Sequence, residues 1–564
     1  MPPLNNREIP SFHAAALILG GAALASKLLG LLRDRLLAGR FGAGDTLDVY
    51  YAAFLIPDFF YTLLLIGAAS AAVLPLYLEY ERSGAGERFV SNLLTVVGTA
   101  AIAFAGLAAA FAPELVGVVA PGFGPEKLAE AARLTRIMMA NVVFLGIAGI
   151  LSSVLQARHR FFVFALPPIA YNLGIILGIV AFVPALGPIG LACGVILGGA
   201  LQVAVQIPAL RALRFRFAPR FDLGDRGLAR VVRTSFPRVA ALSLSQLTLV
   251  ALTAIASSFA AGSVSVFKFA ANLIYVPVGL VGVSYALAMF PKLSAVSIEG
   301  AGREFCDQVL LGLRNILFWA LPSAAILIVL RAHVVRVVLG SGAFNWEDTR
   351  LVAAVLAVLA AAVVSESVLP LILRAFYAVG RTREPFLWDA LGSLATVGIA
   401  LGFSAWFAAN PAALGRVAVV LRIGDLAAPR ILAAAIGFAL GSLLNSILLW
   451  GALKRVLRER FGVGLGIEFG PFASMLGAAV LAGLAAYGAL LPFPALIATN
   501  TFAGILLQGA AAGVVGFAVY GAALAWQGNP EILGLIASVR GRLLSPEKTP
   551  AVYEAEKLDG DAGR

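Results

Sequence analysis

The chain has 564 residues, of which 60% are hydrophobic and only 13% are charged, and its formal net charge is +12. Soluble domains carry about 25% charged residues, so this composition excludes an ordinary soluble protein and indicates a polytopic membrane protein. The basic residues gather in short loops between apolar segments, as expected for loops that stay in the cytosol. Membrane topology therefore explains the positive charge better than a nucleic-acid partner does.

Apolar runs of roughly 20 residues can cross the hydrocarbon core of a bilayer. The sequence predicts fourteen such spans in an all-α fold, with two six-helix lobes around a central cavity and a C-terminal helix pair. The first run begins near Phe12, lacks a convincing cleavage site and is expected to remain as the first span. The predicted spans cover residues 13–38, 48–78, 89–112, 134–156, 163–184, 188–210, 236–260, 266–296, 309–331, 350–376, 386–408, 431–453, 471–491 and 501–526.

The predicted domain order follows from the positions of these spans. It places an N-lobe at 1–212, a cytosolic basic linker at 213–235, a C-lobe at 236–460, helices 13 and 14 at 461–527 and a cytosolic tail at 528–564. Both termini are expected in the cytosol, because Arg and Lys concentrate in the even-numbered loops. The linker has two interpretations: a surface for anionic lipid headgroups, or a solvated connection that fixes topology.

The two lobes are expected to be repeats of one unit. LDVYYAAFLI before Pro75 has the same pattern as SVFKFAANLI before Pro291, and Thr135 and Thr349 each open a predicted helix and precede an Arg. Both pairings have an offset of roughly 215 residues, which indicates an internal duplication. Such duplicated halves are typical of secondary transporters.

The stretch from Ser26 to Glu79 carries ionisable residues at or near membrane depth. An ionisable group at the centre of a span costs roughly 2.5 to 3.5 kcal/mol, so several in one hairpin need a wet surface to face. Lys27 and Asp34 share a helix face, whereas Arg33 lies about 120° around the helix from Lys27. The hairpin is therefore predicted to line a polar cavity, with Asp34 and Asp48 close enough in sequence to pair with Arg33. The charged residues concerned are Lys27, Arg33, Asp34, Arg35 and Asp48.

Several motifs along the chain resemble one known family. They are SKLLGLLRD in the first span, FGAGDTLD in the following turn, GSVSVFKFAANL at 262–273, GSGAFNWEDTR at 340–350 and LRAFYAVGRTREP at 373–385. This set is similar to that of the MurJ (MviN) family of lipid II flippases, within the multidrug, oligosaccharidyl-lipid and polysaccharide exporter superfamily. The resemblance covers residues 14–455.

The resemblance implies a set of substrate-binding residues. In the family, two basic residues of the first span hold the substrate's pyrophosphate, and these positions correspond to Lys27 and Arg33, with Lys in place of Arg at the first. Lys lacks the bidentate fork that Arg offers to phosphate. Asp34 and Asp48 belong to the same predicted set; Asp48 has the alternative role of a helix N-cap or first-turn acid.

Three positions depart from the family pattern. The basic residue of the second span falls here on Tyr61 or Thr62, and its acid falls on Ile66. The Arg of the eighth span falls on Asn272. Lys268 lies four residues before Asn272 and could project from the same helix face, which would restore part of the lost positive charge.

Other candidate chemistry is sparse. Glu366 and Asp389 are interpreted as the remaining acids at membrane depth. They have two alternative roles: coupling of transport to a cation gradient or the membrane potential, or pairing with neighbouring polar groups. No cofactor or metal site is expected, because Cys193, Cys306 and the three histidines are scattered. The loops hold no paired carboxylates or nucleotide motif, so an enzyme is not expected.

The implied function is translocation of an undecaprenyl-pyrophosphate-linked peptidoglycan precursor, lipid II, from the cytoplasmic to the outer leaflet of the bacterial inner membrane by alternating access. Two alternatives stay open: another exporter of the superfamily, for lipid-linked polysaccharide units or amphiphiles, and a transport-dead regulatory partner in cell-wall synthesis. The expected partners are the lipid-linked glycan, anionic membrane lipids and cell-wall synthesis proteins.

Overall fold

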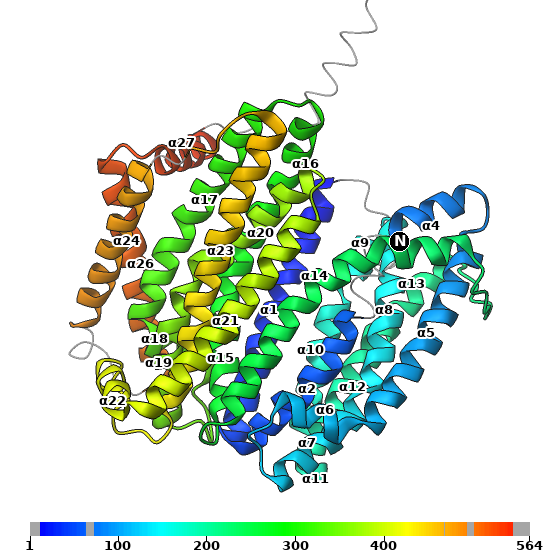
Figure 1. Cartoon of the computed structure of the whole chain (residues 1–564), viewed down its shortest axis with the longest axis horizontal. Helices are drawn as coiled ribbons and strands as arrows, with labels where there is room; N and C mark the ends of the chain where they lie inside the picture. Colours follow the sequence, from blue (N-terminus) through cyan, green and yellow to red (C-terminus); the bar gives the residue numbers. More distant parts are fainter. Residues whose placement is uncertain (1–11, 64–72, 467–468, 493–500, 545–564) are drawn as a thin grey trace, which may run out of the picture.

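The computed structural model describes residues 12–63, 73–466, 469–492 and 501–544. These residues form helices and no strands, which confirms the predicted all-α class. Figure 1 shows two bundles side by side, with α4, α5, α8 and α12 of the first lobe on the right, the green to orange helices of the second on the left, and the dark-blue α1 left of centre. α24 and α26 pack on the far side of the second lobe.

The first lobe contains short helices as well as long ones. Its long helices correspond to predicted spans, but several spans are assembled from two pieces. The helices are α1 Phe12–Phe41, α2 Asp45–Tyr61, α4 Val73–Arg82, α5 Gly86–Ala110, α6 Ala112–Val119, α7 Pro125–Met138, α8 Ala140–Ala157, α9 Phe161–Ala165, α10 Pro167–Leu177, η3 Gly178–Phe182, α11 Val183–Leu186, α12 Ile189–Ala204 and α13 Ile207–Ala212.

The second lobe and the C-terminal region also combine long helices with short ones. The final two spans form a hairpin that packs against α17. The helices are α14 Arg226–Ser257, α15 Ser263–Val278, η4 Gly279–Val283, α16 Ser284–Ile298, α17 Gly302–Val329, α18 Arg331–Leu339, α19 Trp346–Ala360, α20 Ala362–Ala378, α21 Arg383–Ala409, α22 Pro411–Val420, η5 Pro429–Ile431, α23 Leu432–Phe461, α24 Phe469–Leu490, α26 Phe502–Trp526 and α27 Pro530–Leu544.

Several predicted spans are interrupted rather than continuous. The eighth span changes to the π-helix η4 at Gly279, two residues after Pro277, whose missing N–H weakens the preceding turn of the helix. The tenth span bends by 45° between α19 and α20. Hydropathy measures how long an apolar segment is but not whether its helix is straight, so the sequence predicted these spans without their breaks.

The seventh helix begins at Arg226 and not at the predicted 236. Asp225 caps it, because its Oδ1 accepts hydrogen bonds from Gly227 N at 2.6 Å and Leu228 N at 3.3 Å. The last part of the predicted linker is therefore helical. In Figure 1, α14 runs diagonally through the middle of the view, between the two bundles.

Small residues allow the helices to pack closely. A Cβ placed on Gly174 of α10 would come within 2.3 Å of Gly198 of α12, and one placed on Gly437 of α23 would come within 2.4 Å of Ala400 of α21. Backbones this close exchange many van der Waals contacts, which is the main attraction between helices in lipid. Both lobes therefore behave as tightly packed bodies.

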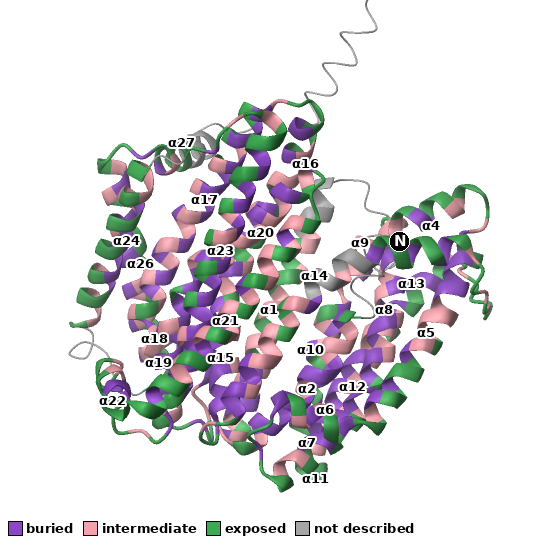
Figure 2. Cartoon of the chain, viewed as in Figure 1, coloured by how far each residue is buried: buried purple, intermediate pink, exposed green. Residues whose placement is uncertain are grey.

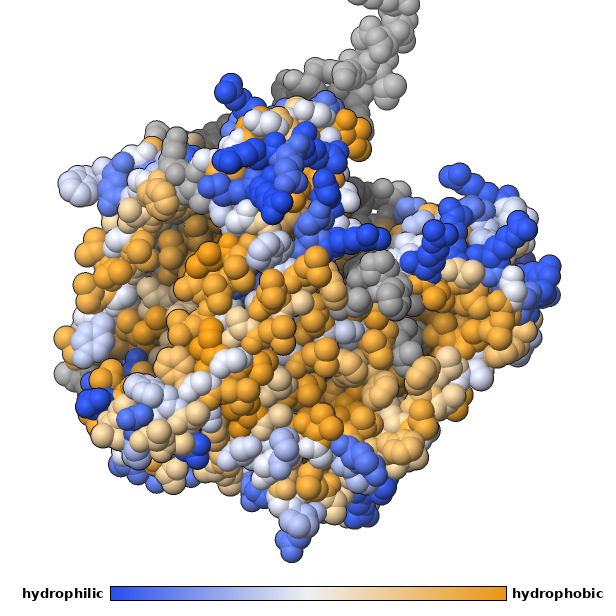
Figure 3. Space-filling view, viewed as in Figure 1, coloured by the Kyte–Doolittle hydropathy of each residue, from blue (hydrophilic) through white to orange (hydrophobic). Residues whose placement is uncertain are grey.

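The molecule has the surface of a membrane protein. Figure 3 shows a broad orange band of apolar residues across the middle of the visible face, with blue polar residues at its upper and lower margins. The described residues contain ten helices long and apolar enough to cross a membrane, or eleven if α19 and α20 form one span. The other predicted spans correspond to α1, α2 and α14, each with three or more charged residues, and the count of fourteen stays a prediction.

The predicted orientation can be tested by cysteine labelling in intact cells. In a variant without Cys193 and Cys306, a cysteine at Arg226 should be inaccessible to a membrane-impermeant reagent, and one at Ala412 should react. Both side chains are exposed, so the difference would report the side of the membrane and not burial. Labelling at Arg226 but not at Ala412 would invert the topology.

Candidate functional site

A cavity of about 410 Å³ lies between the two lobes. It is bounded by α1, α2, α8, α10 and α12 on one side and by α15 on the other. Aromatic side chains form much of its wall, and the charged and polar groups are few. The lining residues used below are Arg33, Asp58, Tyr61, Asn172, Lys268 and Asn272.

An ion pair on α1, next to this cavity, is linked to the opposite lobe by a hydrogen bond. Arg33 Nη2 donates to Asp34 Oδ1 at 2.8 Å, and Arg33 Nε donates to the same oxygen at 3.0 Å. Asp34 Oδ2 accepts from Asn272 Nδ2 of α15 at 2.9 Å. Asp34 is only 3% exposed, so loss of Arg33 would leave a buried carboxylate without its ion-pair partner, which typically costs 3 to 5 kcal/mol.

Asn172 of α10 fixes the orientation of Arg33. Its Oδ1 accepts from Arg33 Nη1 at 3.3 Å, while its Nδ2 donates to the backbone oxygens of Ser26 and Pro168 at 3.3 and 3.1 Å. The guanidinium is thus held by α1 and α10 together. The only sequence signal for this role was an amide in an otherwise apolar helix.

Lys268 and Asn272 line the same cavity, as their four-residue spacing on one helix predicted. Asp58 of α2 also lines it, so Glu366 and Asp389 were not the only remaining acids at membrane depth, and that interpretation was wrong. Gln246 of α14 donates to Asp58 Oδ2 at 3.2 Å, and so crosses from one lobe to the other.

The positions that depart from the family pattern are also near this cavity. Tyr61 lines it, and Thr62 is buried, with its hydroxyl oxygen accepting from Gln246 Nε2 at 3.3 Å. Ile66 lies outside the described residues. The second span therefore contributes the acid Asp58 and a tyrosine at the depth where the resemblance led us to look for a basic residue.

Lys27 occupies a different place from Arg33. It is not among the residues that line the cavity. Its Nζ lies against η4, where a Cβ on Gly279 would come within 2.7 Å of it. Lys27 therefore faces the π-helical break of the eighth span, and its role in binding stays a prediction.

Asp48 does not pair with Arg33, so the predicted pairing was wrong. Its Oδ2 accepts from Gly262 N at 2.8 Å and its Oδ1 accepts from Ser265 N at 2.7 Å. These are free amides at the start of α15, where a helix dipole favours a negative charge. Asp48 lies in the first turn of α2, as the alternative interpretation expected, but the amides that it binds belong to α15 of the opposite lobe.

The same end of the molecule holds further contacts between the lobes. We call it the closed end, formed by residues 39–48, 262–265 and 340–348. Ala343 N donates to Gly39 O at 2.8 Å, and Ala43 N donates to Asp348 Oδ2 at 3.4 Å. Figure 2 shows buried residues gathered at this lower end, around α15 and α19.

Glycine is required at the closed end for two reasons. Gly262 has a φ of +86°, a left-handed conformation that other residues rarely adopt. A Cβ there would also come within 2.3 Å of Ala43 O in the opposite lobe. The GSVS motif therefore has a physical explanation, because it lets α15 start directly against the turn between α1 and α2.

The GSGAFNWEDTR motif has an equally direct explanation. Asn345 Oδ1 accepts from Asp348 N at 2.8 Å and Asn345 N donates to Asp348 Oδ2 at 3.1 Å, which forms a capping box at the start of α19. Asp348 Oδ2 also accepts from Ala43 N. The motif thus caps its own helix and holds the opposite lobe.

Glu366 and Asp389 lie inside the second lobe, away from the cavity lining. Asp389 Oδ1 accepts from Asn445 Nδ2 of α23 at 2.8 Å. Glu366 of α20 lies beside Ser442 of α23 and close to Asp389 of α21. Among the described residues, no group of three or more His, Cys, Asp or Glu could hold a metal ion.

The chain matches a family model described as lipid II flippase MurJ over residues 37–507. It is 31% identical over 370 residues to a probable lipid II flippase MurJ from Buchnera aphidicola, covering 64% of this chain and 72% of that protein. It is 30% identical over 382 residues to a lipid II flippase MurJ from Burkholderia cenocepacia, covering 66% of this chain and 74% of that protein.

Solved structures agree with this match at the level of the fold. A lipid II flippase MurJ in an inward closed conformation superposes with a TM-score of 0.70 and 21% identity, covering 90% of this chain and all of that one. An inward-facing multidrug transporter of the MATE family gives 0.61 and 15%, covering 77% of this chain and 96% of that one. The chain belongs to the MurJ family of lipid II flippases.

Proposed function

We propose that this protein is a multi-pass flippase that moves lipid II from the cytoplasmic to the outer leaflet of the bacterial inner membrane. Its membership of the MurJ family supports lipid II as the substrate. The observation that carries the proposal is Arg33, which lines a cavity between the lobes and pairs with the buried Asp34 beside it. A guanidinium at membrane depth is costly unless it serves an anionic ligand or a structural acid.

The substrate's pyrophosphate would compete with carboxylates for the cations of the cavity. Arg33 and Lys268 are the cations, and Asp34 and Asp58 are the nearby acids, so the empty site is balanced in charge. Phosphate oxygens accept bidentate hydrogen bonds from a guanidinium as carboxylates do. Asn172 already orients Arg33 toward this space, which lowers the entropy lost on binding.

Alternating access requires that one end of the cavity be closed while the other admits the substrate. The closed end has buried bonds from Asp48 to Gly262 and Ser265. At the opposite end, the described ion pair between the lobes is Arg230–Glu79, whose side chains are about 60% exposed. Exposed pairs contribute little. Leu228 and Val231 of α14 are buried there against the first lobe, so we expect this end to open with the start of α14 staying on the first lobe.

The changed positions favour one alternative substrate. One basic residue expected from the family falls on Tyr61 or Thr62 and another on Asn272, and Lys268 restores one positive charge a helical turn before Asn272. The alternative is an exporter that carries another undecaprenyl-linked glycan with a different headgroup. A transport-dead partner in cell-wall synthesis is the third interpretation, and anionic lipids and cell-wall proteins remain proposed partners.

Glu366 and Asp389 are proposed to couple transport to a cation gradient. In the absence of a gradient, Glu366→Gln should flip lipid as fast as the wild-type protein. An imposed proton or sodium gradient should no longer accelerate flipping, because the neutral amide cannot exchange a proton or bind a cation as strongly. Proteoliposomes with each gradient provide the measurement. Glu459→Gln, on the polar end of α23, is the matched control, and a full gradient response in Glu366→Gln would exclude the coupling role.

The main test is flipping of labelled lipid II by Arg33 variants in proteoliposomes. Arg33→Ala should slow flipping roughly ten- to hundredfold, because a charge-assisted hydrogen bond is worth about 1.5 to 3 kcal/mol. Arg33→Lys should retain part of the activity, since it keeps the charge but loses the bidentate contact. Arg133→Ala removes an exposed arginine of α7, outside both the cavity and the closed end, and should have no effect.

Two results would change the conclusion. Full activity in Arg33→Ala would mean that this residue is a structural anchor and that the headgroup binds elsewhere. A wild-type protein that flips another undecaprenyl-linked glycan but not lipid II would favour the alternative exporter. A protein that flips neither would favour the transport-dead partner.

A further inference from the structure

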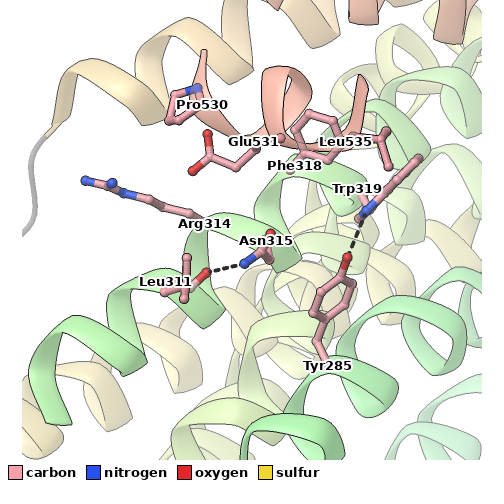
Figure 4. A pocket seen from close by; sticks show the side chains of 10 residues that line it. Tyr285, Leu311, Arg314, Asn315, Phe318, Trp319, Pro530, Glu531 and Leu535 are labelled. Atoms are coloured by element: carbon pink, nitrogen blue, oxygen red, sulfur yellow. Dashed lines mark hydrogen bonds between the residues drawn. The ribbon is translucent and has the colours of Figure 1, made fainter. Parts of the chain in front are cut away.

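A second pocket, of about 420 Å³, lies away from the central cavity, between α16, α17 and the C-terminal helix α27 (Figure 4). Pockets that hold small ligands commonly have 300 to 1,000 Å³. Its wall combines an acid, a base, an amide and three aromatic rings. The residues concerned are Tyr285, Arg314, Asn315, Phe318, Trp319 and Glu531.

The pocket lies at the boundary between the apolar and polar parts of the molecule. Arg314 is the last charged residue of α17, and no other follows it before Arg331. On the other wall, α27 follows α26 after a short turn and lies across the end of the bundle in Figure 1. Lipid headgroups occupy this depth.

α27 has the character of an interfacial helix. Its apolar residues Leu533, Leu535 and Ile536 are 46%, 40% and 48% exposed, as expected for side chains that face lipid. Its start is fixed, because Asn529 Oδ1 accepts from Glu531 N at 3.1 Å and from Ile532 N at 3.4 Å. Glu531 is therefore held at the mouth of the pocket by the backbone.

One oxygen of the Glu531 carboxylate has no hydrogen-bond partner among the described residues. Its Oε2 is buried and has no hydrogen-bond partner. A buried charge without a partner is costly, so a ligand with N–H donors would stabilise it. Figure 4 shows Glu531 above Asn315, with Arg314 extending to one side of it and Trp319 and Tyr285 on the other.

The aromatic side of the pocket is also fixed in orientation. Trp319 Nε1 donates to the Tyr285 hydroxyl at 3.2 Å. Phe318 meets Trp319 edge to face, with ring centroids 5.0 Å apart. Aromatic faces next to a carboxylate attract an ammonium group, and a guanidinium is suited to bind phosphate.

We propose that this pocket binds the zwitterionic headgroup of an ethanolamine phospholipid. The ammonium contacts Glu531 and the rings of Trp319 and Tyr285, and the phosphate contacts Arg314. A choline headgroup has no N–H to donate to Glu531, and an anionic glycerol headgroup places no positive charge against it. The bound lipid ties α27 to α17, and the site is independent of lipid II transport.

The test is lipid binding by the full-length protein, purified in detergent and measured by native mass spectrometry. Phosphatidylethanolamine should bind about tenfold or more tightly than phosphatidylglycerol with the same acyl chains, since one charge-assisted hydrogen bond exceeds 1.4 kcal/mol. Glu531→Gln should remove most of this preference, and Arg314→Gln should weaken both lipids. Glu299→Gln, an exposed acid at the C-terminal end of α16, is the matched control.

A second measurement needs no substitution. Ethanolamine lipids carrying one, two and three N-methyl groups should bind the wild-type protein progressively more weakly, because each methyl removes a donor. Equal binding of all headgroups by the wild-type protein would overturn the proposal. An unchanged preference in Glu531→Gln would also overturn it.

Discussion

The structure depends on the rule that a charge inside a membrane protein must have a partner. Asp34 satisfies this rule with one oxygen on Arg33 of its own helix and the other on Asn272 of the opposite lobe. The contact that neutralises the buried charge is therefore also a contact between the lobes. A headgroup that draws Arg33 away from Asp34 changes both the charge balance and the attachment of the lobes, which links binding to movement.

The closed end shows how the motifs of the family serve this movement. Asp48 and Asp348 each lie in one lobe and accept hydrogen bonds from backbone amides of the other. Buried apolar side chains also pack across the lobes here, such as Tyr51 of α2 against Phe269 of α15, so opening this end must separate apolar contacts as well as hydrogen bonds. Within each lobe, by contrast, close glycine contacts such as Gly174 with Gly198 make internal rearrangement difficult. The lobes are thus expected to move as bodies around the cavity.

Much of this could be predicted from the sequence, and the failures have physical reasons. Hydropathy and charge depth indicated the all-α membrane fold and a polar cavity containing Arg33, and helix spacing placed Lys268 beside Asn272. The partner of Asp48 was predicted wrongly. Asp48 is near Arg33 in sequence, but in the folded chain its carboxylate binds the amides at the start of α15. Asp58 was overlooked, and the roles of Asn172 and Gln246 depend on neighbours that only the folded chain brings together.

The central claim is that Lys268 supplies the second cation of the binding site in place of a basic residue at 272. The most direct measurement is lipid II flipping by Lys268→Ala alone and combined with Asn272→Arg, at matched protein levels. The account predicts that Lys268→Ala loses most flipping and that the added substitution restores it, because the two positions lie one turn apart on the same face of α15. Wild-type flipping by Lys268→Ala alone would contradict the account.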